Sequence, residues 1–303
     1  LTDTNGFEFS IAGPPSVAQP GPFATNGTPL TFTGATLSET GSYPPDTMGA
    51  VGPSQFIVAV NGRIRSFSKA TGLADGAVNA SMDSFFSSVM TPTVSPIIGN
   101  FVSDPRIRYD RLSGRWVVII IDVPYTSSSS IGATPNRVLI AVSSTNTITS
   151  GTVWSFYYFQ HDQVGSAPNN DTGKFADYPT LGIDANALYI GVNIFDSSGS
   201  FYNTTAYIVR KSSILSGGSI VVSAFRNLIS QSGIGPYTPQ GVDNFDPAAT
   251  EGYVIGVDAV NSARLRLRRV SSCVISAPNR PVCSGSSPDC SSSTIKARRR
   301  RSM

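Results

Sequence analysis

The sequence predicts an all-β fold made of repeated antiparallel sheets, and three observations lead to this prediction. The first is composition: 14% of the 303 residues are charged, whereas 40% are hydrophobic and 10% are aromatic. Few charged residues argue against long surface helices, and many aromatic residues argue against disorder. The second is a series of short runs rich in Val, Ile, Tyr and Phe, which are typical of strands. The third is that these runs recur at a regular interval.

The chain divides into three parts by composition. Residues 1–42 are rich in Pro, Gly and Thr, which predicts an extended lead-in with short strands. Residues 43–272 contain the β-like runs and form the predicted folded domain. Residues 273–303 are rich in Cys, Ser and Arg and resemble nothing upstream, so we expect a disordered or non-native tail. The alternative interpretation of the run 298–301 is a basic arm for an anionic surface.

The net charge of +3 arises from the tail. Residues 273–303 hold six basic residues and one acidic residue, which leaves 16 basic and 18 acidic residues in 1–272. The domain is therefore not expected to bind nucleic acid. All three cysteines also lie in the tail, so no disulfide framework is expected in the domain. No run approaches the ~20 apolar residues of a membrane-spanning helix, so we expect no membrane insertion.

Individual runs differ in the burial they predict. The run 116–121 is continuously apolar, which predicts a strand buried on both faces, whereas 63–67 alternates as a half-buried strand does. One short helix is expected at 82–89. The other predicted strands are 56–60, 137–142, 153–157, 188–192, 206–209, 219–223, 253–257 and 264–268.

Two independent landmarks recur with a period of about 66 residues. An aromatic residue opens a β-run at four places, and a small polar turn closes a hairpin at 69–71, 142–144, 211–213 and 270–272. The four aromatic residues are Phe56, Trp116, Tyr189 and Tyr253. Such a period, holding about four strands, predicts β-propeller-like blades with long loops. Because 303 residues hold about 4.6 such periods, the ring is expected to be incomplete; the alternative architecture is a β-sandwich.

Three segments carry a resemblance to a known group of proteins. They are PPDTMGAVGP at 44–53, DPRIRYDRLSGRW at 104–116 and DYPTLGID at 177–184. The chain resembles large secreted bacterial proteins of β-propeller type, mostly of unassigned activity. The resemblance covers about residues 40–270 and implies an extracellular propeller module, often joined to adhesion modules. It implies no catalytic residues, and it ends after residue 272, where further blade sequence would be expected.

Three aspartates are the leading candidates for a site. Asp46, Asp104 and Asp177 each precede an inner strand of a predicted blade, so they are expected to converge on one end of the propeller axis. Converging carboxylates suit Ca²⁺, which prefers oxygen ligands, and we assign them as candidate metal ligands. Paired carboxylates also suit glycoside hydrolysis. The structural alternative is that each aspartate caps a turn by accepting from the backbone.

Two arginines are candidates for ligand binding. Arg106 and Arg108 alternate with Ile107 and therefore share one strand face, from which they could bind an acidic sugar. Pairing with acids of the same or a neighbouring blade is the alternative. His161 is the single histidine, and one histidine cannot form a histidine metal centre. The sequence also has no Gly-x-Ser-x-Gly motif, which argues against a serine hydrolase that would use His161. Aromatic residues at 157–159 and 201–202 could stack on sugars or belong to the core.

These observations predict a secreted or cell-surface, bacterial-type protein without catalytic residues. We expect a monomeric recognition or scaffold module of a larger exoprotein, which binds an extracellular glycan or protein on the face formed by the blade loops. The alternative is a carbohydrate-active enzyme, a glycoside hydrolase or lyase, that uses paired carboxylates on the same face. No cofactor other than Ca²⁺ is expected.

Overall fold

The computed structural model describes residues 31–165, 169–228 and 236–257, together with the backbone of three later strands. The chain divides into two units, Leu1–Phe32 and Thr33–Met303, and the account below concerns the second. Most of the predicted lead-in therefore lies outside the described residues. Its described end carries the short helix α1 (Leu37–Thr40) rather than a strand, because Thr36 and Glu39 form a capping box and Gly41 ends the turn at φ 62°.

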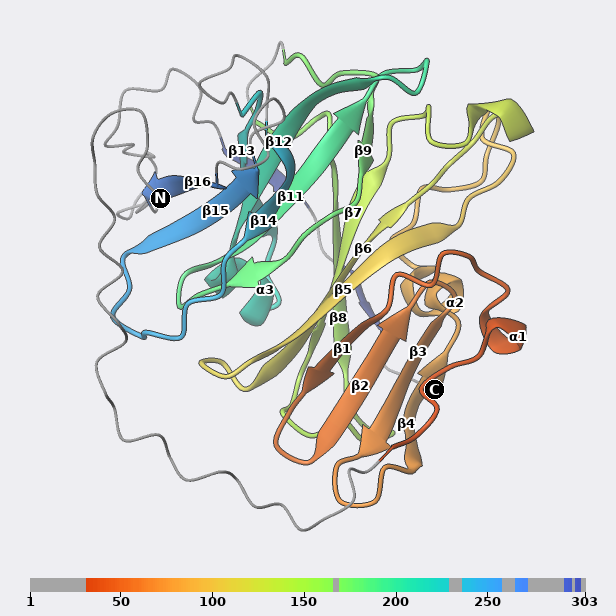
Figure 1. The fold of residues 1–303 in the computed structure, drawn as a ribbon, viewed down its shortest axis with the longest axis vertical. Coiled ribbons are helices and arrows are strands. Elements are labelled where there is room, and N and C mark those ends of the chain that lie inside the picture. Colours follow the sequence, from red (N-terminus) through yellow and green to blue (C-terminus); the bar gives the residue numbers. More distant parts are fainter. Residues whose placement is uncertain are drawn as a thin grey trace, which may run out of the picture. The chain divides into compact units, whose positions relative to one another are not determined.

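The second unit is all-β, with four antiparallel sheets that follow one another along the chain (Figure 1). Sheet 1 contains β1 (Met48–Val51), β2 (Gln55–Val60), β3 (Arg63–Ser68) and β4 (Ala74–Ala80). Sheet 2 contains β5 (Val102–Asp110), β6 (Arg115–Asp122), β7 (Arg137–Ser143), β8 (Trp154–Gln160) and β18 (Arg298–Arg300). Sheet 3 contains β9 (Phe175–Asp177), β10 (Gly182–Ile183), β11 (Ala187–Phe195), β12 (Phe201–Arg210), β13 (Ile220–Phe225) and β17 (Ser292–Ile295). Sheet 4 contains β14 (Tyr237–Gly241), β15 (Glu251–Val257) and β16 (Leu265–Ser271).

Most strands pair with the next strand along the chain, as in a β-meander, and in sheet 3 both β9 and β10 pair with β11. Short helical turns connect some of them: α2 (Met82–Phe86), η1 (Ser128–Ser130) and α3 (Lys211–Leu215). Helix α2 confirms the helix predicted at 82–89 over its first five residues, and Ser81 caps it by accepting from Ser84 N at 3.2 Å. The turn expected at 211–213 is instead the start of α3.

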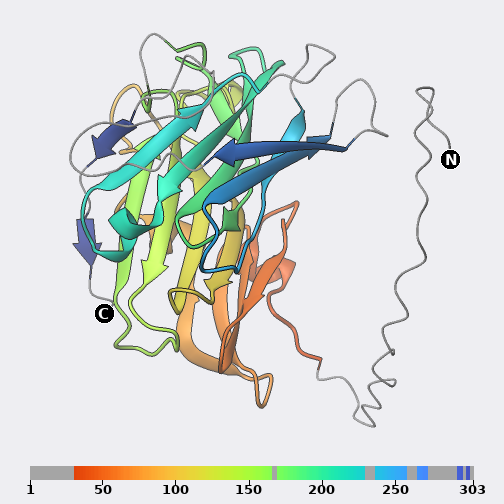
Figure 2. The ribbon, with the colours of Figure 1, turned by 90° about the vertical axis from the view of Figure 1, so that its left-hand side faces the viewer.

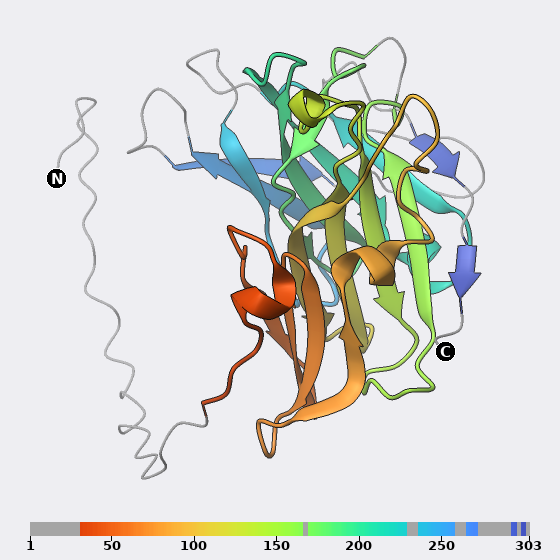
Figure 3. The same cartoon turned by 90° about the vertical axis from the view of Figure 1, so that its right-hand side faces the viewer.

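Sheet 2 is covered on both faces, as the continuous apolar run of β6 predicts. On one face, Trp116, Val118 and Ile120 pack in a cluster with residues of sheet 1 such as Ile57 and Ile64. On the other face, the alternate β6 residues Val117 and Ile119 pack in a cluster with residues of sheet 3 such as Leu188. Figure 3 shows the sheet of β1–β4 beside that of β5–β8. Because strand side chains alternate between faces, one continuous apolar strand serves two cores.

Sheet 3 is also covered on both faces. Its second face contributes Ala187, Tyr189 and Ala206 to a small cluster with Val254 of sheet 4. The sheets are therefore layered in the order 1, 2, 3, 4. A two-layer β-sandwich, the alternative architecture, would leave no sheet covered on both faces, so it does not describe this arrangement.

Two of the four recurrent aromatic residues, Trp116 and Tyr189, pack between sheets. Each ring lies against a glycine of the neighbouring sheet, where no larger residue would fit. A Cβ added to Gly252 of sheet 4 would lie 1.8 Å from the Tyr189 ring, and one added to Gly52 would lie 2.3 Å from the Trp116 ring. Trp116 Nε1 also donates to Asn146 O at 2.8 Å. An aromatic residue opposite glycine thus sets the spacing between adjacent layers.

The tail, for which the sequence predicts disorder or a non-native segment, contributes two short strands. Strand β17 pairs antiparallel with β13, and β18 pairs antiparallel with β8. Figure 2 shows both strands beside the outer edges of sheets 3 and 2. The composition of the tail predicts a segment that cannot form a core of its own. An edge strand, however, offers unpaired N–H and C=O groups with which an adjacent segment can pair. The rest of 273–303 lies outside the described residues.

Candidate functional site

A left-handed residue occurs near the start of every sheet, within its first strand or within two residues of that strand. Its φ is 41° at Asp46, 62° at Asp104, 51° at Tyr178 and 49° at Thr238. In sheets 2 to 4 a proline follows it, and pairing with the second strand is interrupted there. Such a backbone is uncommon outside glycine and costs about 1–3 kcal/mol, so the surrounding structure must hold it.

The sequence places Asp46, Asp104 and Asp177 at equivalent positions. The left-handed residues show that the equivalent position in sheet 3 is one residue later, at Tyr178. Asp46 and Asp104 occupy the position itself, but in sheet 3 it is occupied by Tyr178, and Asp177 precedes it. In sheet 4 the position is held by Thr238. The cluster therefore has the three predicted carboxylates, and in sheet 3 the left-handed position that spacing assigned to Asp177 is occupied by Tyr178.

The three aspartates nevertheless meet, as predicted. The side chain of Asp104 is within hydrogen-bond contact of both Asp46 and Asp177, so one carboxyl group from each of three sheets shares one small space. Ser103 Oγ also donates to Asp104 Oδ1 at 3.2 Å. Asp104 is only 8% exposed, whereas Asp46 and Asp177 are half-buried. We name these three residues the carboxylate cluster.

Burial and mutual repulsion raise the pKa values in the cluster. Burial is the largest cause of the rise in the pKa of Asp104 to about 7, followed by its hydrogen bond with Asp46 and the charges of Asp177 and Asp46. Burial also raises the pKa of Asp177, partly offset by hydrogen bonds from Tyr178 N and Asp104. Three adjacent carboxyl groups cannot all ionise at low cost. Asp104 therefore holds its proton up to near-neutral pH, and its single O–H can donate to one neighbouring carboxyl group at a time.

An asparagine joins sheet 1 to this cluster, and sequence reasoning missed it. Asn61 Oδ1 accepts from Asp104 N at 2.8 Å. Its Nδ2 donates to Asp46 Oδ2 at 2.7 Å and to Pro44 O at 2.9 Å. Asn61 is buried and therefore fixes the relative positions of two of the three aspartates.

Similar asparagines join the other sheets. Asn136 Oδ1 accepts from Ala176 N, and its Nδ2 donates to Ala176 O, both at 2.9 Å, which links sheet 2 to sheet 3. Asn193 Oδ1 accepts from Thr238 N at 2.8 Å, which links sheet 3 to sheet 4. Asparagine is depleted in strands, so an asparagine within or beside a predicted strand is the sequence signal that could have indicated these links.

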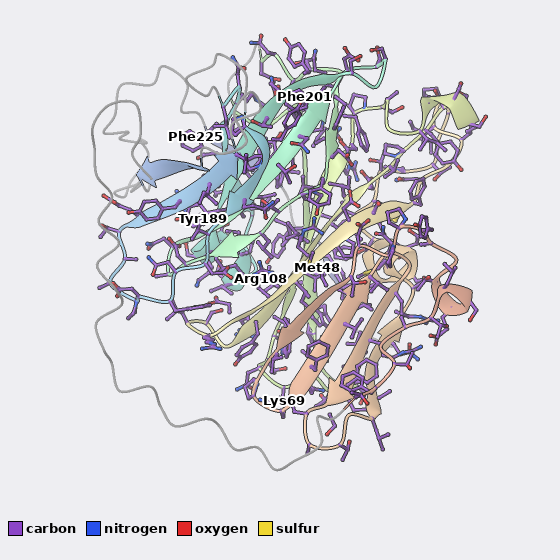
Figure 4. All side chains as sticks on the ribbon, in the orientation of Figure 1. Met48, Lys69, Arg108, Tyr189, Phe201 and Phe225 are labelled. Carbon is purple, nitrogen blue, oxygen red and sulfur yellow. The ribbon has the colours of Figure 1, made fainter. Side chains whose placement is uncertain are left out.

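The two candidate arginines have different partners. The Arg106 guanidinium is buried and lies 4.4 Å from the centre of the Tyr178 ring, beside the carboxylate cluster. Arg108, labelled in Figure 4, extends from β5 to sheet 4, where its Nε donates to Asp243 Oδ2 at 3.0 Å. Arg108 is thus paired with an acid of another sheet, which was the alternative interpretation. Only Arg106 belongs to the surroundings of the cluster.

An aromatic group lies beside the cluster on sheets 3 and 4. The Phe201 ring, labelled in Figure 4, is 4.4 Å from that of Tyr237 and 6.0 Å from that of Phe195. Tyr237 is 47% exposed, and it directly precedes Thr238, the partner of Asn193. Asn193 is in turn the cross-strand neighbour of Asp177. The buried Asn193 therefore connects the strand that carries Asp177 with the segment that carries Tyr237.

The other aromatic candidates separate into core and surface. Tyr157 and Phe159 are fully buried in the core between sheets 2 and 3, so the core interpretation holds for them. Tyr158 is partly buried beneath the Arg137 guanidinium, 3.9 Å from its ring centre. Tyr202 is exposed, and Lys174 Nζ lies 4.1 Å from its ring centre.

His161 is fully buried and has a structural environment. Its Nε2 is 2.7 Å from Lys174 O, and its Nδ1 is 3.4 Å from the Tyr207 hydroxyl. Burial lowers the pKa of the imidazole, so the ring is neutral. Its backbone oxygen accepts from Arg226, which also pairs with Asp171. These contacts hold the loop after β8 against β12.

The described ranges contain no set of three or more His, Cys, Asp or Glu side chains arranged to hold a metal ion. In the carboxylate cluster, Asp104 hydrogen-bonds with Asp46 and with Asp177, and protonation of Asp104 relieves the repulsion between the carboxyl groups. Calcium binding at Asp46, Asp104 and Asp177 stays a prediction.

No protein-family model matches the chain, and no curated protein matches it either. Within the described part of the chain, no helix has the length and apolar character needed to cross a membrane. The functional argument therefore depends on the geometry of the site.

Proposed function

We propose that this protein is a non-catalytic recognition module that binds a glycan beside the carboxylate cluster. The observation that carries the proposal is that carboxyl groups from three sheets meet at one partly exposed place, next to exposed tyrosine rings. We further propose that the four layered sheets are blades of a β-propeller. The meander order, the layering and the left-handed residue shared by all four sheets support this architecture.

The chemistry of the region suits a sugar. Hydroxyl groups need acceptors as well as donors, and the cluster offers carboxyl oxygens beside the protonated Asp104. Tyr178 is 36% exposed and Tyr237 is 47% exposed, so each presents part of a ring face on which a sugar could stack. Aromatic walls with a few convergent polar groups are typical of ligand sites.

The secreted, bacterial-type location belongs to the same proposal. It is supported by the resemblance of 44–53, 104–116 and 177–184 to secreted propeller proteins. A module of a larger exoprotein would present this region to extracellular glycans or to a protein partner.

A glycan array tests the proposal. The full chain is applied to the array, and the affinity for the best glycan is then measured by calorimetry. Tyr178→Ala and Asp46→Asn are expected to weaken binding at least tenfold, because each removes a contact with the ligand. Asp196→Asn is the matched control: this carboxylate lies on the exposed turn between β11 and β12, where Ser198 N and Ser200 N donate to it. Equal affinity in all four proteins would contradict the site.

A carbohydrate-active enzyme is the second candidate, because a pKa near 7 makes Asp104 a competent general acid at neutral pH. The direct contact between the carboxyl groups is shorter than the ~5–10 Å that separates the two carboxylates of glycosidases. The geometry therefore favours binding over hydrolysis. Turnover on a polysaccharide panel that Asp104→Asn abolishes, without loss of the fold, would reverse this order.

A further inference from the structure

Arg106 is a buried cation that has no ion-pair partner in the described part of the chain. It is 4% exposed, but none of the four ion pairs formed by the described residues includes it. Lys211 is equally buried, and its Nζ lies 2.8 Å from Asp110 Oδ2. A buried charge without a counter-ion destabilises a fold. Stability therefore does not account for an arginine at this position.

Strand alternation places Arg106 on the face of β5 that is turned toward sheet 3. Pairing of β5 with β6 is interrupted after Ser103, and Arg106 is the first residue to pair again. Its neighbour Ile107 enters the core shared with sheet 1, so Arg106 projects from the opposite face. There its guanidinium lies 4.4 Å from the centre of the Tyr178 ring. This contact and the hydrogen bond from Nη1 to Pro105 O hold the guanidinium in place.

The carboxylate cluster is not the counter-ion of Arg106. Asp104 hydrogen-bonds with Asp46 and with Asp177, and none of the three forms an ion pair with a described residue. An adjacent guanidinium would lower the pKa of a carboxyl group, whereas the pKa values of Asp104 and Asp177 are raised. Arg106 is therefore available to an anionic ligand.

One edge of the Arg106 guanidinium is free. Its Nη1 donates to Pro105 O at 2.9 Å, whereas its Nε and Nη2 donate to no acceptor among the residues that the structure describes. The N–H groups of this edge are parallel, and a carboxylate accepts from such a pair in bidentate geometry. A hydroxyl group would accept from only one of them at full strength. The free edge therefore favours a ligand that carries a carboxylate.

We propose that Arg106 binds the carboxylate of an acidic sugar, so that the glycan recognised beside the carboxylate cluster is a hexuronate. Tyr178 is 36% exposed and contacts Arg106, and its N–H donates to Asp177. A hexuronate stacked on the exposed part of this ring brings its carboxylate close to the guanidinium and its hydroxyl groups close to the carboxyl oxygens of the cluster. This inference rests on the proposed glycan binding and names the class of glycan, with Arg106 as the residue that determines specificity.

The unfolding experiment uses no ligand and asks whether Arg106 has a structural role. Because its charge has no counter-ion among the described residues, Arg106→Gln is expected to leave the midpoint of urea unfolding unchanged or to raise it. Arg226→Gln is the matched comparison, because it removes a cation that is paired with Asp171, and it should lower the midpoint. An equal decrease in both variants would overturn the inference, because Arg106 would then act as a structural cation.

The binding experiment compares each sugar with and without its charge. Oligomers of galacturonate, glucuronate and mannuronate, each also in its methyl-esterified form, are titrated into the full chain by calorimetry, beside a panel of neutral glycans. The ester keeps the ring and the hydroxyl groups but has no anion, so it is expected to bind at least tenfold more weakly than the acid. Equal affinity for acid and ester, or binding of neutral glycans alone, would overturn the inference and leave glycan binding intact. Absence of binding to every glycan would contradict the proposed function as well.

The same titrations on three variants assign the charge preference to one residue. Arg106→Gln is expected to bind the acid at least tenfold more weakly and the ester unchanged, whereas Arg106→Lys, which keeps the charge but not the parallel donors, should retain part of the preference. Arg111→Gln is the control: this guanidinium also lies against a ring, 5.3 Å from the centre of Phe245, but in the exposed turn at the other end of β5. It should keep the full preference. Equal weakening of acid and ester in Arg106→Gln would overturn the inference, because Arg106 would then support only the shape of the site.

Discussion

The protonation of Asp104 makes stability depend on pH, and Asp104→Asn isolates this effect. Folding raises the pKa of Asp104 from 3.8 to about 7, so between these values the folded state binds a proton that the unfolded state has lost. The free energy of unfolding therefore falls as pH rises from about 4 to 7, by about 1.4 kcal/mol per pH unit. The whole interval corresponds to about 4 kcal/mol. Asparagine keeps the shape and a donor but cannot ionise.

Urea unfolding of both proteins at several pH values from 4 to 8 measures this difference. At pH 4 the two free energies of unfolding should be similar, and by pH 8 the variant should be more stable by up to about 4 kcal/mol. Asp196→Asn, in an exposed turn, should show no such crossover. A constant difference between Asp104→Asn and the unmodified chain across this pH range would refute the reasoning, because Asp104 would then ionise in the folded protein as it does in water.

Three further substitutions test how the sheets are joined, each by the free energy of unfolding in urea. Asn61→Ala should cost about 1–3 kcal/mol, because it leaves the buried Asp104 N–H without its acceptor. Gly252→Ala should cost about 1–3 kcal/mol or more, because its Cβ would overlap the Tyr189 ring. Lys211→Met should cost about 3–5 kcal/mol, because Lys211 Nζ lies 2.8 Å from the buried Asp110 carboxylate, which would lose its cation.

Each of these substitutions has a matched control. Asn170→Ala removes an exposed asparagine and Gly218→Ala adds a Cβ with no neighbour closer than 3.4 Å, so both should stay within about 0.5 kcal/mol of the unmodified chain. For Lys211→Met, addition of Asp110→Asn should recover part of the loss, because the buried charge is then removed. Losses as large in the controls as in the test variants would show that the named contacts do not carry the effect.

Local pattern was sufficient to predict much of the fold. The continuous apolar run 116–121 predicted a strand buried on both faces, and β6 confirms it because its alternate residues enter two different cores. The aspartates of three predicted blades were expected to converge, and the side chains of Asp46, Asp104 and Asp177 do meet. These predictions succeeded because strand periodicity and the order of elements along the chain are local properties.

The sequence by itself determined the all-β class, the succession of sheets and the segments that approach one another. The tertiary structure alone decided the chemistry of the site. Asp104 binds a proton because packing removes it from water beside two other carboxyl groups, which no spacing expresses. Asn61 belongs to the site because it contacts Asp104, which is far away in the chain. Tyr178 belongs to it because the left-handed position of sheet 3 lies one residue after Asp177, where strand pairing is interrupted. The same is true of β17 and β18: their composition predicts disorder, and only the unpaired backbone of a neighbouring sheet edge gives them strand structure.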